Sequence, residues 1–492
     1  MMTPEDIQRM PLKTLQDTCL SLSRDYQVLQ QELATLKRMI FGTKSERYLP
    51  LKDEANQQSL FSESRESVKE AASEKVLSYT RNKKGEKGHG RQVLPSHLPR
   101  EEVVIEPEAD LTGCEKIGEE VTEQLEYRPS RLYVIRFIRP VYATADKEKI
   151  LTGMLPDRPI ERGIPGPGLL SHVIVSKFMD HLPLYRLRQI FKREGMSIAA
   201  STLDGWVKAS AELLEPLYQR MGERIREKGY LQADETPIQV LDPSKRGRSH
   251  RGYFWVYYAP WDGEVYFDYQ RGRSREGPQA MLGTYKGWLQ TDGYTIYDDF
   301  EASEGIERSH CMAHARRYFE KALRTDDRAH AMMKWIQVLY KTEKEAREGG
   351  LSHDERHKIR QEQSVPVLEK METWLKAYQY EALPQSNLGK AIAYMQTRWE
   401  TLKVFAEHGE LEIDTNLVEN AIRPVAVGRK NYLFAGSHDG AQRLALFYTL
   451  VNNAKSAGLN PETYLREVIS RIASHPYHKL DDLLPQNIIL TQ

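Results

Sequence analysis

Cysteine is scarce in this chain: only Cys19, Cys114 and Cys311 occur among 492 residues, and they lie far apart. This spacing forms neither a disulfide framework nor a paired-cysteine motif, which favours a reducing compartment. Long apolar runs are also missing, since no stretch approaches the roughly 18 residues of a membrane-spanning helix. The first residues lack the basic and apolar segments of a signal peptide. We therefore expect a cytoplasmic protein with no membrane contact.

An excess of charge of either sign is absent as well. Lys and Arg number 70, Asp and Glu number 70, and the net charge is zero. A globally basic chain is therefore excluded, and any affinity for nucleic acid must come from local basic patches. Apolar residues make up 40% and charged residues 28% of the chain, a balance typical of soluble globular proteins. The length predicts roughly three or four structural units.

A heptad pattern runs from Leu12 to Ile40. Apolar residues alternate three and four positions apart, and leucine occupies positions 15, 22, 29 and 36. Such a seam is typical of a coiled coil, so we predict a homo-oligomer formed through residues 12–40. The alternative is an amphipathic helix packed on its own protein.

A polar segment follows over residues 49–100. Its basic, glycine-rich stretch 81–91 is either a linker that binds phosphates or a solvated linker without a partner.

Helices are predicted between residues 161 and 228. One covers 184–193, Gly195 breaks the chain, and a second helix begins near residue 198 and carries Ser201 and Thr202 in its first turn. A short helix, a glycine turn and a second helix with small polar residues at its start form the helix-turn-helix pattern. Ser201 and Thr202 are therefore candidate DNA contacts. Many helical hairpins that bind no DNA have the same pattern.

From residue 229 the periodicity becomes that of strands. The predicted strands cover 229–241, 252–259, 264–269, 286–293 and 306–311, and the predicted helices among them cover 277–282 and 313–323. Three successive strands, a helix, a strand, a helical turn and a strand follow the order of a ribonuclease-H-like α/β core. Residues 325–400 have a wholly helical pattern. Helices are also predicted at 417–426, at 440–455 and after Pro461.

Three acids are expected to meet in such a core. Asp234 lies on the first predicted strand and Asp292 ends the fourth, and these two strands are neighbours in this fold. The third acid must come from a late helix, where Glu419 is the candidate; Glu235 and Asp414 are the nearest substitutes. Three carboxylates suit two Mg²⁺ ions, or Mn²⁺, which cleave phosphodiesters by stabilising the attacking and leaving oxygens. Taken singly, each acid is better explained as an N-cap or a solvated charge.

Several motifs resemble those of transposases of the bacterial insertion sequence 66 family, over nearly the whole chain. The motifs lie at Met39–Arg47, Ala233–Pro237, Leu289–Tyr294, Cys311–Arg317 and Asn416–Gly436. The resemblance implies a DDE core in which Asp234, Asp292 and Glu419 are the matching positions. It implies Mg²⁺-dependent cleavage at transposon ends and transfer of the 3′-OH into target DNA. The implied partners are terminal-repeat and target DNA, with accessory proteins of the element as further candidates, at the bacterial nucleoid.

The resemblance and the periodicity together predict the organisation of the chain. In chain order, the segments are a leucine-zipper-like coiled coil (1–48), a polar and basic linker (49–100), a degenerate finger-like β segment (101–160), a helix-turn-helix region (161–228), the first part of the core (229–324), a helical insertion (325–400), the end of the core with Glu419 (401–436) and a C-terminal helical element (437–492).

The finger-like segment departs from the family pattern. The family usually has two CxxC-like pairs for zinc there, whereas this chain has only Cys114. Tetrahedral zinc needs four ligands, so we predict no zinc. Cys311 and His314 have CxxH spacing, which fits either half of a metal site or, more often, a buried polar contact near an active site.

Basic residues close to these motifs are candidate phosphate contacts. They are Arg316, Arg317, Arg423, Arg429 and Lys430. The alternative is that they are ordinary charges on helix surfaces.

Other functions remain open at this point. A ribonuclease-H-like nuclease would use the same acids without strand transfer. A DNA-binding regulator derived from a transposase would have lost catalysis, but all three acids are present. A helical scaffold protein would leave the aspartates on the strands unexplained.

Overall fold

The computed structural model describes residue 132 and residues 141–143, 150–152, 157–160, 163–241, 249–300 and 304–490. The chain divides into two compact units, Met1–Leu125 and Glu126–Gln492, and all described residues belong to the second. The predicted coiled coil, the linker and most of the finger-like segment therefore lie outside the described residues. From that segment, the structure describes the antiparallel pair β1 (Val141–Ala143) and β2 (Ile150–Thr152).

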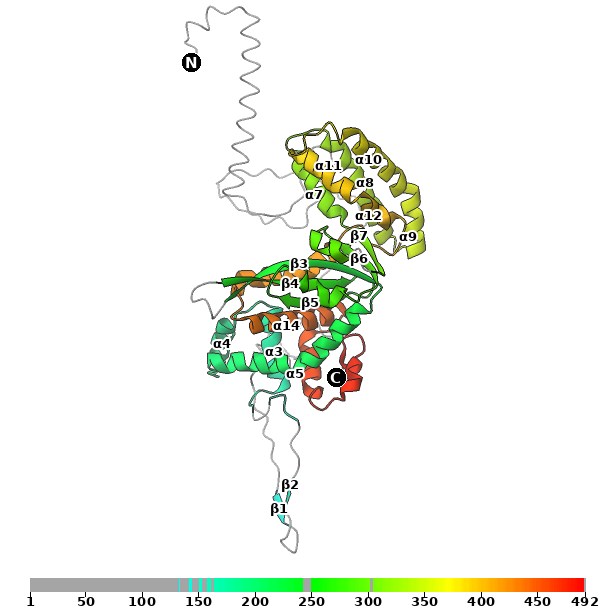
Figure 1. Cartoon of the computed structure of the whole chain (residues 1–492). Coiled ribbons are helices and arrows are strands. Elements are labelled where there is room, and N and C mark those ends of the chain that lie inside the picture. Colours follow the sequence, from blue (N-terminus) through cyan, green and yellow to red (C-terminus); the bar gives the residue numbers. More distant parts are fainter. Residues whose placement is uncertain are drawn as a thin grey trace, which may run out of the picture. The chain divides into compact units, whose positions relative to one another are not determined.

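The centre of the second unit is a five-stranded sheet in the order β5-β4-β3-β6-β7 (Figure 1). Its strands are β3 (Tyr230–Leu241), β4 (Ser249–Ala259), β5 (Glu264–Gln270), β6 (Gly287–Thr291) and β7 (Ile306–His310). The first three are antiparallel, whereas β6 is parallel to both β3 and β7. This mixed topology is consistent with the predicted ribonuclease-H-like core.

The strands of the sheet carry large apolar side chains, and these side chains are buried. Trp255, Tyr257 and Phe267 on β4 and β5 are fully inaccessible to solvent. Helices α5 (Ala200–Arg226) and α14 (His438–Ser456) pack against β5, and Tyr218 of α5 donates a hydrogen bond from Oη to the carbonyl oxygen of Phe267 at 2.7 Å. Helix α13 (Asn416–Tyr432) contacts β3 and β4.

The two helices of the predicted helix-turn-helix are present. Helix α4 covers Leu184–Arg193, Gly195 follows with φ of +92°, and α5 begins at Ala200. Helix α5 has 27 residues and reaches the sheet, so it is part of the core as well as the second helix of the hairpin. Ser201 and Thr202 are exposed in its first turn, and their DNA-binding role stays a prediction. Helix α3 (Pro167–Phe178) precedes this pair.

The helices of the insertion lie together (Figure 1). Their hydrophobic core includes Met332, Met371 and Trp374. The elements of the insertion are α8 (Ala329–Glu348), α9 (His353–Ile359), the π-helical turn η2 (Arg360–Ser364), α10 (Val365–Tyr378), α11 (Asn387–Thr397), α12 (Trp399–Lys403) and η3 (Val404–Ala406). Helix α7 (Met312–Ala322) leads into it from β7 and packs against α8 and α11. Helices joined by short turns make up most of residues 325–400, for which the pattern predicts helix throughout.

One predicted boundary is wrong. Helix α13 was expected to end near residue 426, but it continues through Pro424 to Tyr432. Proline removes one backbone hydrogen bond inside a helix. Burial of Val418, Val425 and Gly428 along the same face offsets that loss.

The remaining elements are α6 (Glu276–Leu282), η1 (Thr295–Phe300), α15 (Pro461–Arg471) and η4 (Tyr477–Leu483). Within the described residues, no helix is long and apolar enough to cross a membrane.

Candidate active site

Asp234 lies in the middle of β3, opposite Val256 of β4. Its Oδ1 accepts a hydrogen bond from the backbone N–H of Glu235 at 2.7 Å. Burial raises the pKa of Asp234 well above its ordinary value, and the negative charges of Glu235, Asp292 and Glu419 raise it further. The structure therefore places Asp292 and Glu419 within electrostatic reach of Asp234.

Asp292 follows the last residue of β6 and is held in a tight turn. Its Oδ1 accepts from the backbone N–H of Tyr294 at 2.9 Å, and Gly293 between them has φ of +83°, a conformation that favours glycine. The insertion supports this turn: Tyr394 Oη donates to the carbonyl oxygen of Asp292 at 2.6 Å, and Arg398 donates to that of Gly293 at 2.8 Å.

Glu419 lies in the first turn of α13. Both of its carboxylate oxygens accept from one terminal nitrogen of Arg317, at 2.9 and 2.8 Å. His314 Nε2 lies 3.9 Å from Glu419 Oε1 and 2.9 Å from the other terminal nitrogen of Arg317. Arg317, predicted as a phosphate contact, is thus joined in this structure to the predicted catalytic glutamate.

The other predicted phosphate contacts differ in their surroundings. Arg429 donates to Thr236 Oγ1 at 3.0 Å and to the carbonyl oxygen of Pro237, so it ties α13 to β3. Arg423 and Lys430 are exposed on α13, and Arg316 is half-buried on α7.

The two substitute acids, Glu235 and Asp414, are engaged with other side chains. Successive residues of a strand point to opposite faces, so Glu235 points away from the face of Asp234. Its side chain is only 2% exposed and accepts hydrogen bonds from Arg273 and from Tyr297 Oη at 3.2 Å. Asp414 accepts from Tyr340 Oη at 2.8 Å and from the Asn416 side chain at 2.6 Å, immediately before α13.

Sequence reasoning missed a group of exposed arginines beside the site. Arg251, Arg271, Arg273 and Arg275, here called the arginine rim, lie at the start of β4 and just after β5. The guanidinium of Arg273 lies 3.8 Å from the ring centroid of Tyr294, two residues after Asp292. The sequence contains a signal for this basic group, because residues 271, 273 and 275 are all arginine.

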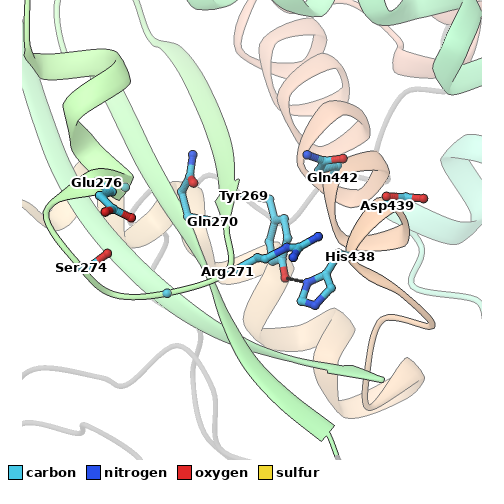
Figure 2. A pocket seen from close by; sticks show the side chains of 10 residues that line it. Tyr269, Gln270, Arg271, Ser274, Glu276, His438, Asp439 and Gln442 are labelled. Atoms are coloured by element: carbon cyan, nitrogen blue, oxygen red, sulfur yellow. Dashed lines mark hydrogen bonds between the residues drawn. The ribbon is translucent and has the colours of Figure 1, made fainter. Parts of the chain in front are cut away.

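A cavity of about 320 Å³ adjoins the rim (Figure 2). Figure 2 shows Arg271 on its wall and a hydrogen bond between Tyr269 and His438, which lies at the start of α14. Tyr269 Oη and His438 Nδ1 are 2.6 Å apart. Glu276 and Asp439 also line it, so its charge is mixed, and none of the three predicted acids is among its lining residues.

The donor set suits a hard divalent cation, although no three His, Cys, Asp or Glu side chains of the described residues form a ready cation cage. The pairing of Glu419 with Arg317 accounts for this in part, since both carboxylate oxygens are engaged. Carboxylate oxygens are the hard donors that Mg²⁺ and Mn²⁺ take, and a cation would offset the repulsion that Asp292 and Glu419 exert on Asp234.

Cys311 has the environment of a packing residue. It is fully buried, its Sγ accepts from the backbone N–H of Thr415 at 3.2 Å, and burial raises the pKa of its thiol to about 12. Metal ligation requires the thiolate, so this environment favours the polar-contact interpretation of Cys311 and His314.

Comparison with known proteins assigns the family. The model "Transposase IS66 family" matches residues 162–443, "Transposase C of IS166 homeodomain" matches 28–103, and "IS66 C-terminal element" matches 449–486. The uncharacterized protein y4jD of Sinorhizobium fredii is 34% identical over 492 residues, covering 95% of each chain. The uncharacterized protein y4qI of the same organism is 33% identical, covering 92% of this chain and 88% of its own. The chain belongs to the IS66 family of transposases, with a DDE catalytic domain, a leucine-zipper N-terminal region and a C-terminal element.

Proposed function

We propose that the protein cleaves DNA at transposon ends to free a 3′-OH and then transfers that 3′-OH into target DNA. The proposal is supported by the position of Asp292, directly after β6, and of Glu419, on α13, close enough to Asp234 on the neighbouring strand β3 for their charges to raise its pKa. Each acid comes from a different rigid element, as pre-organised catalytic groups require.

The three carboxylates would hold Mg²⁺, with Mn²⁺ as a substitute. When bound, such ions supply Lewis-acid stabilisation of the attacking and leaving oxygens of the phosphodiester. Asp234 offers one oxygen already oriented by the Glu235 N–H, and Asp292 is oriented by the Tyr294 N–H. Arg317 pairs with Glu419 in this structure, so a cation would compete with Arg317 for that carboxylate.

A nuclease without strand transfer would use the same residues, so the decisive experiment is a strand-transfer assay with pre-cleaved terminal-repeat DNA. Joining of the 3′-OH ends to target DNA in Mg²⁺ supports the transposase. Cleavage of uncut ends without any joining of pre-cleaved ends would favour the nuclease.

The arginine rim is part of the proposed path of DNA to the acids. Because Arg273 already holds Glu235 and stacks on Tyr294, the neighbouring Arg251 and Arg271 are better placed to bind phosphates. The exposed Arg423 and Lys430 on α13, and Ser201 and Thr202 on α5, would make further contacts. Arg316 stays a predicted phosphate contact, and Arg317 and Arg429 would have to leave the protein partners described above before they could bind DNA.

The salt dependence of binding tests the rim. Each phosphate contact contributes about −0.9 to the slope of log K against log salt, so Arg251→Ala with Arg271→Ala should flatten that slope by about two units. The same change is expected from Arg423→Ala with Lys430→Ala. Lys341→Ala with Lys344→Ala, exposed on α8, is the control and should leave the slope unaltered. If a double variant keeps the wild-type slope, the two side chains that it replaces do not contact phosphates.

Self-association through residues 12–40 would allow both transposon ends to be handled in one complex. Leu22→Lys with Leu29→Lys places charges in the predicted seam, and it should abolish self-association measured by sedimentation velocity. Mg²⁺ binding by the core should be unchanged. Gln27→Lys with Gln31→Lys adds the same charges outside the seam and should sediment like the wild type. Unchanged sedimentation of the leucine variant would refute the coiled-coil role.

A further inference from the structure

Each of the two strands that carry a candidate catalytic aspartate also carries a glutamine two residues earlier. The sequences are Gln232-Ala233-Asp234 on β3 and Gln290-Thr291-Asp292 at the end of β6. The parallel register places Gln232 directly beside Gln290, and both side chains are completely buried. Since side chains alternate along a strand, Gln232 lies on the same face of β3 as Asp234.

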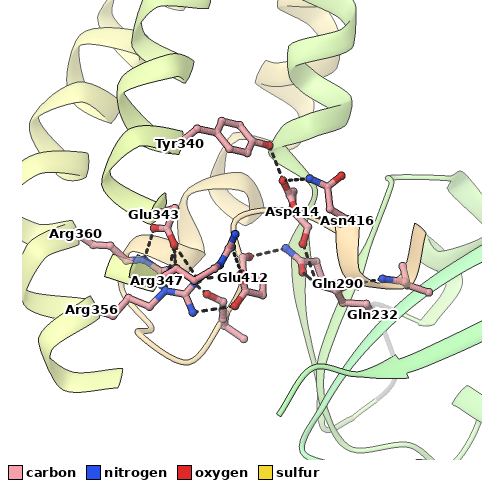
Figure 3. Close-up of polar contacts among 12 residues, drawn as sticks. Gln232, Gln290, Tyr340, Glu343, Arg347, Arg356, Arg360, Glu412, Asp414 and Asn416 are labelled. Carbon is pink, nitrogen blue, oxygen red and sulfur yellow. Dashed lines mark hydrogen bonds and ion pairs between the residues drawn. The ribbon is translucent and has the colours of Figure 1, made fainter. Parts of the chain in front are cut away.

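The two amides bind each other and the chain that leads to Glu419 (Figure 3). Gln232 Nε2 donates to Gln290 Oε1 and to the carbonyl oxygen of Asp414, both at 2.8 Å. Gln290 Nε2 donates to the carbonyl oxygen of Glu412 at 2.8 Å. Gln232 Oε1 accepts from the backbone N–H of Val418 at 3.2 Å, one residue before Glu419.

Tyr230 completes the arrangement. Its Oη donates to Gln290 Oε1 at 2.5 Å and accepts from the backbone N–H of Glu412 at 3.2 Å. This buried region presents main-chain carbonyl oxygens and a main-chain N–H to the two glutamines. A neutral side-chain amide can bind both kinds of group, because it is a donor and an acceptor. An apolar side chain of the same size would leave the main-chain groups of residues 412, 414 and 418 without their partners.

The insertion holds the same segment from the other side. Arg356 donates to the carboxylate of Glu412 at 2.9 and 3.0 Å, and Tyr340 Oη donates to that of Asp414 at 2.8 Å. Residues 412–418 are thus fixed between the sheet and the insertion, and Figure 3 shows both sets of contacts meeting there.

We propose that Gln232 and Gln290 are positioning residues that dock residues 412–418 on the sheet and so set the place of Glu419 relative to Asp234 and Asp292. This inference rests on the proposed function of the three acids. The glutamines touch neither DNA nor the reacting atoms; they act through the main chain before Glu419.

The test replaces Gln290 by Met, which keeps the length of the side chain and removes the amide. Mn²⁺ binding to the full-length protein, followed by electron paramagnetic resonance, should weaken by about 10- to 100-fold, as for other residues that orient metal ligands. Hydrogen exchange of residues 412–419 should become faster. The cleavage rate should fall in Mg²⁺, while the Kd for terminal-repeat DNA stays unchanged. Gln239→Met, an exposed position on β3, is the matched control.

The outcomes separate this inference from the proposed function. If the wild type neither binds Mn²⁺ nor cleaves DNA, the proposed function fails. If the wild type does both, and Gln290→Met retains the wild-type Mn²⁺ affinity and exchange rates, the positioning role is overturned, whatever happens to cleavage. Should Gln290→Met not fold, Gln232→Asn is measured instead. It keeps a neutral amide on a shorter side chain, and the same weakening of Mn²⁺ binding is required of it.

Discussion

Asp292→Asn is expected to abolish Mg²⁺-dependent cleavage of terminal-repeat DNA while leaving DNA binding equal or slightly tighter. The amide keeps the shape of the side chain and its hydrogen bond from the Tyr294 N–H, but it removes a charged oxygen donor that Mg²⁺ needs. It also removes a negative charge that would repel the scissile phosphate. Cleavage measured on labelled DNA should fall by at least about 1,000-fold, the size of loss found when an essential catalytic group is removed.

The matched control for this variant is Glu307→Gln. Glu307 is exposed on β7 and pairs with Trp288 near the start of β6, whereas Asp292 follows the end of that strand, so it loses the same charge at a distance from Asp292. It should cleave like the wild type. If Asp292→Asn retained cleavage in Mg²⁺, the assignment of Asp292 would be wrong, and Asp234→Asn would then show whether the site as a whole had been misplaced.

The sheet was predictable because its signals are local. Strands β3 to β5 are rich in aromatic and branched residues and are separated by turn residues, and both aspartates follow from their places on β3 and β6. Alternation along β3 also explains why Glu235, adjacent to Asp234 in sequence, lies on the other face and binds Arg273.

The partners of the site residues were not predictable, because they depend on tertiary contacts between distant segments. Arg317 and Glu419 are 102 residues apart, and Arg429 and Thr236 are 193 apart. Periodicity places each residue on a face of its own element and says nothing about which element comes opposite. The extension of α13 beyond Pro424 has the same origin, since burial of its apolar face overrides a local helix-breaking signal.

Ion pairs connect the insertion to the segment that precedes Glu419 (Figure 3). Arg360, at the first position of η2, has no exposed surface. It donates to both carboxylate oxygens of Glu343 at 2.7 Å, to the carbonyl oxygens of Phe405 and His408 at 2.7 Å, and to that of Leu411 at 2.9 Å. All five N–H groups of the guanidinium are therefore used. Leu411 is followed directly by the segment that the glutamine pair docks on the sheet.

Arg360→Met is accordingly expected to lower the free energy of unfolding of the insertion by about 3–5 kcal/mol, the cost of breaking a buried ion pair by removing one partner. The loss arises because Glu343 keeps only Arg356 and three carbonyl oxygens lose a donor. Urea unfolding followed by tryptophan fluorescence measures it. Arg347→Met is the control, because that side chain is 72% exposed and 3.5 Å from Glu412, and such surface pairs contribute less than about 1 kcal/mol.

A second replacement separates the ion pair from the rest of the network. Glu343→Gln combined with Arg360→Met removes the buried carboxylate charge that Arg360→Met leaves with Arg356 alone, so the double variant should recover part of the stability lost in Arg360→Met. Because Leu411 leads into the segment before Glu419, Arg360→Met should also slow DNA cleavage and accelerate hydrogen exchange at residues 412–419. A variant that loses about 3–5 kcal/mol in the insertion yet keeps wild-type cleavage and exchange would show that the sheet side alone, through Gln232 and Gln290, places the glutamate.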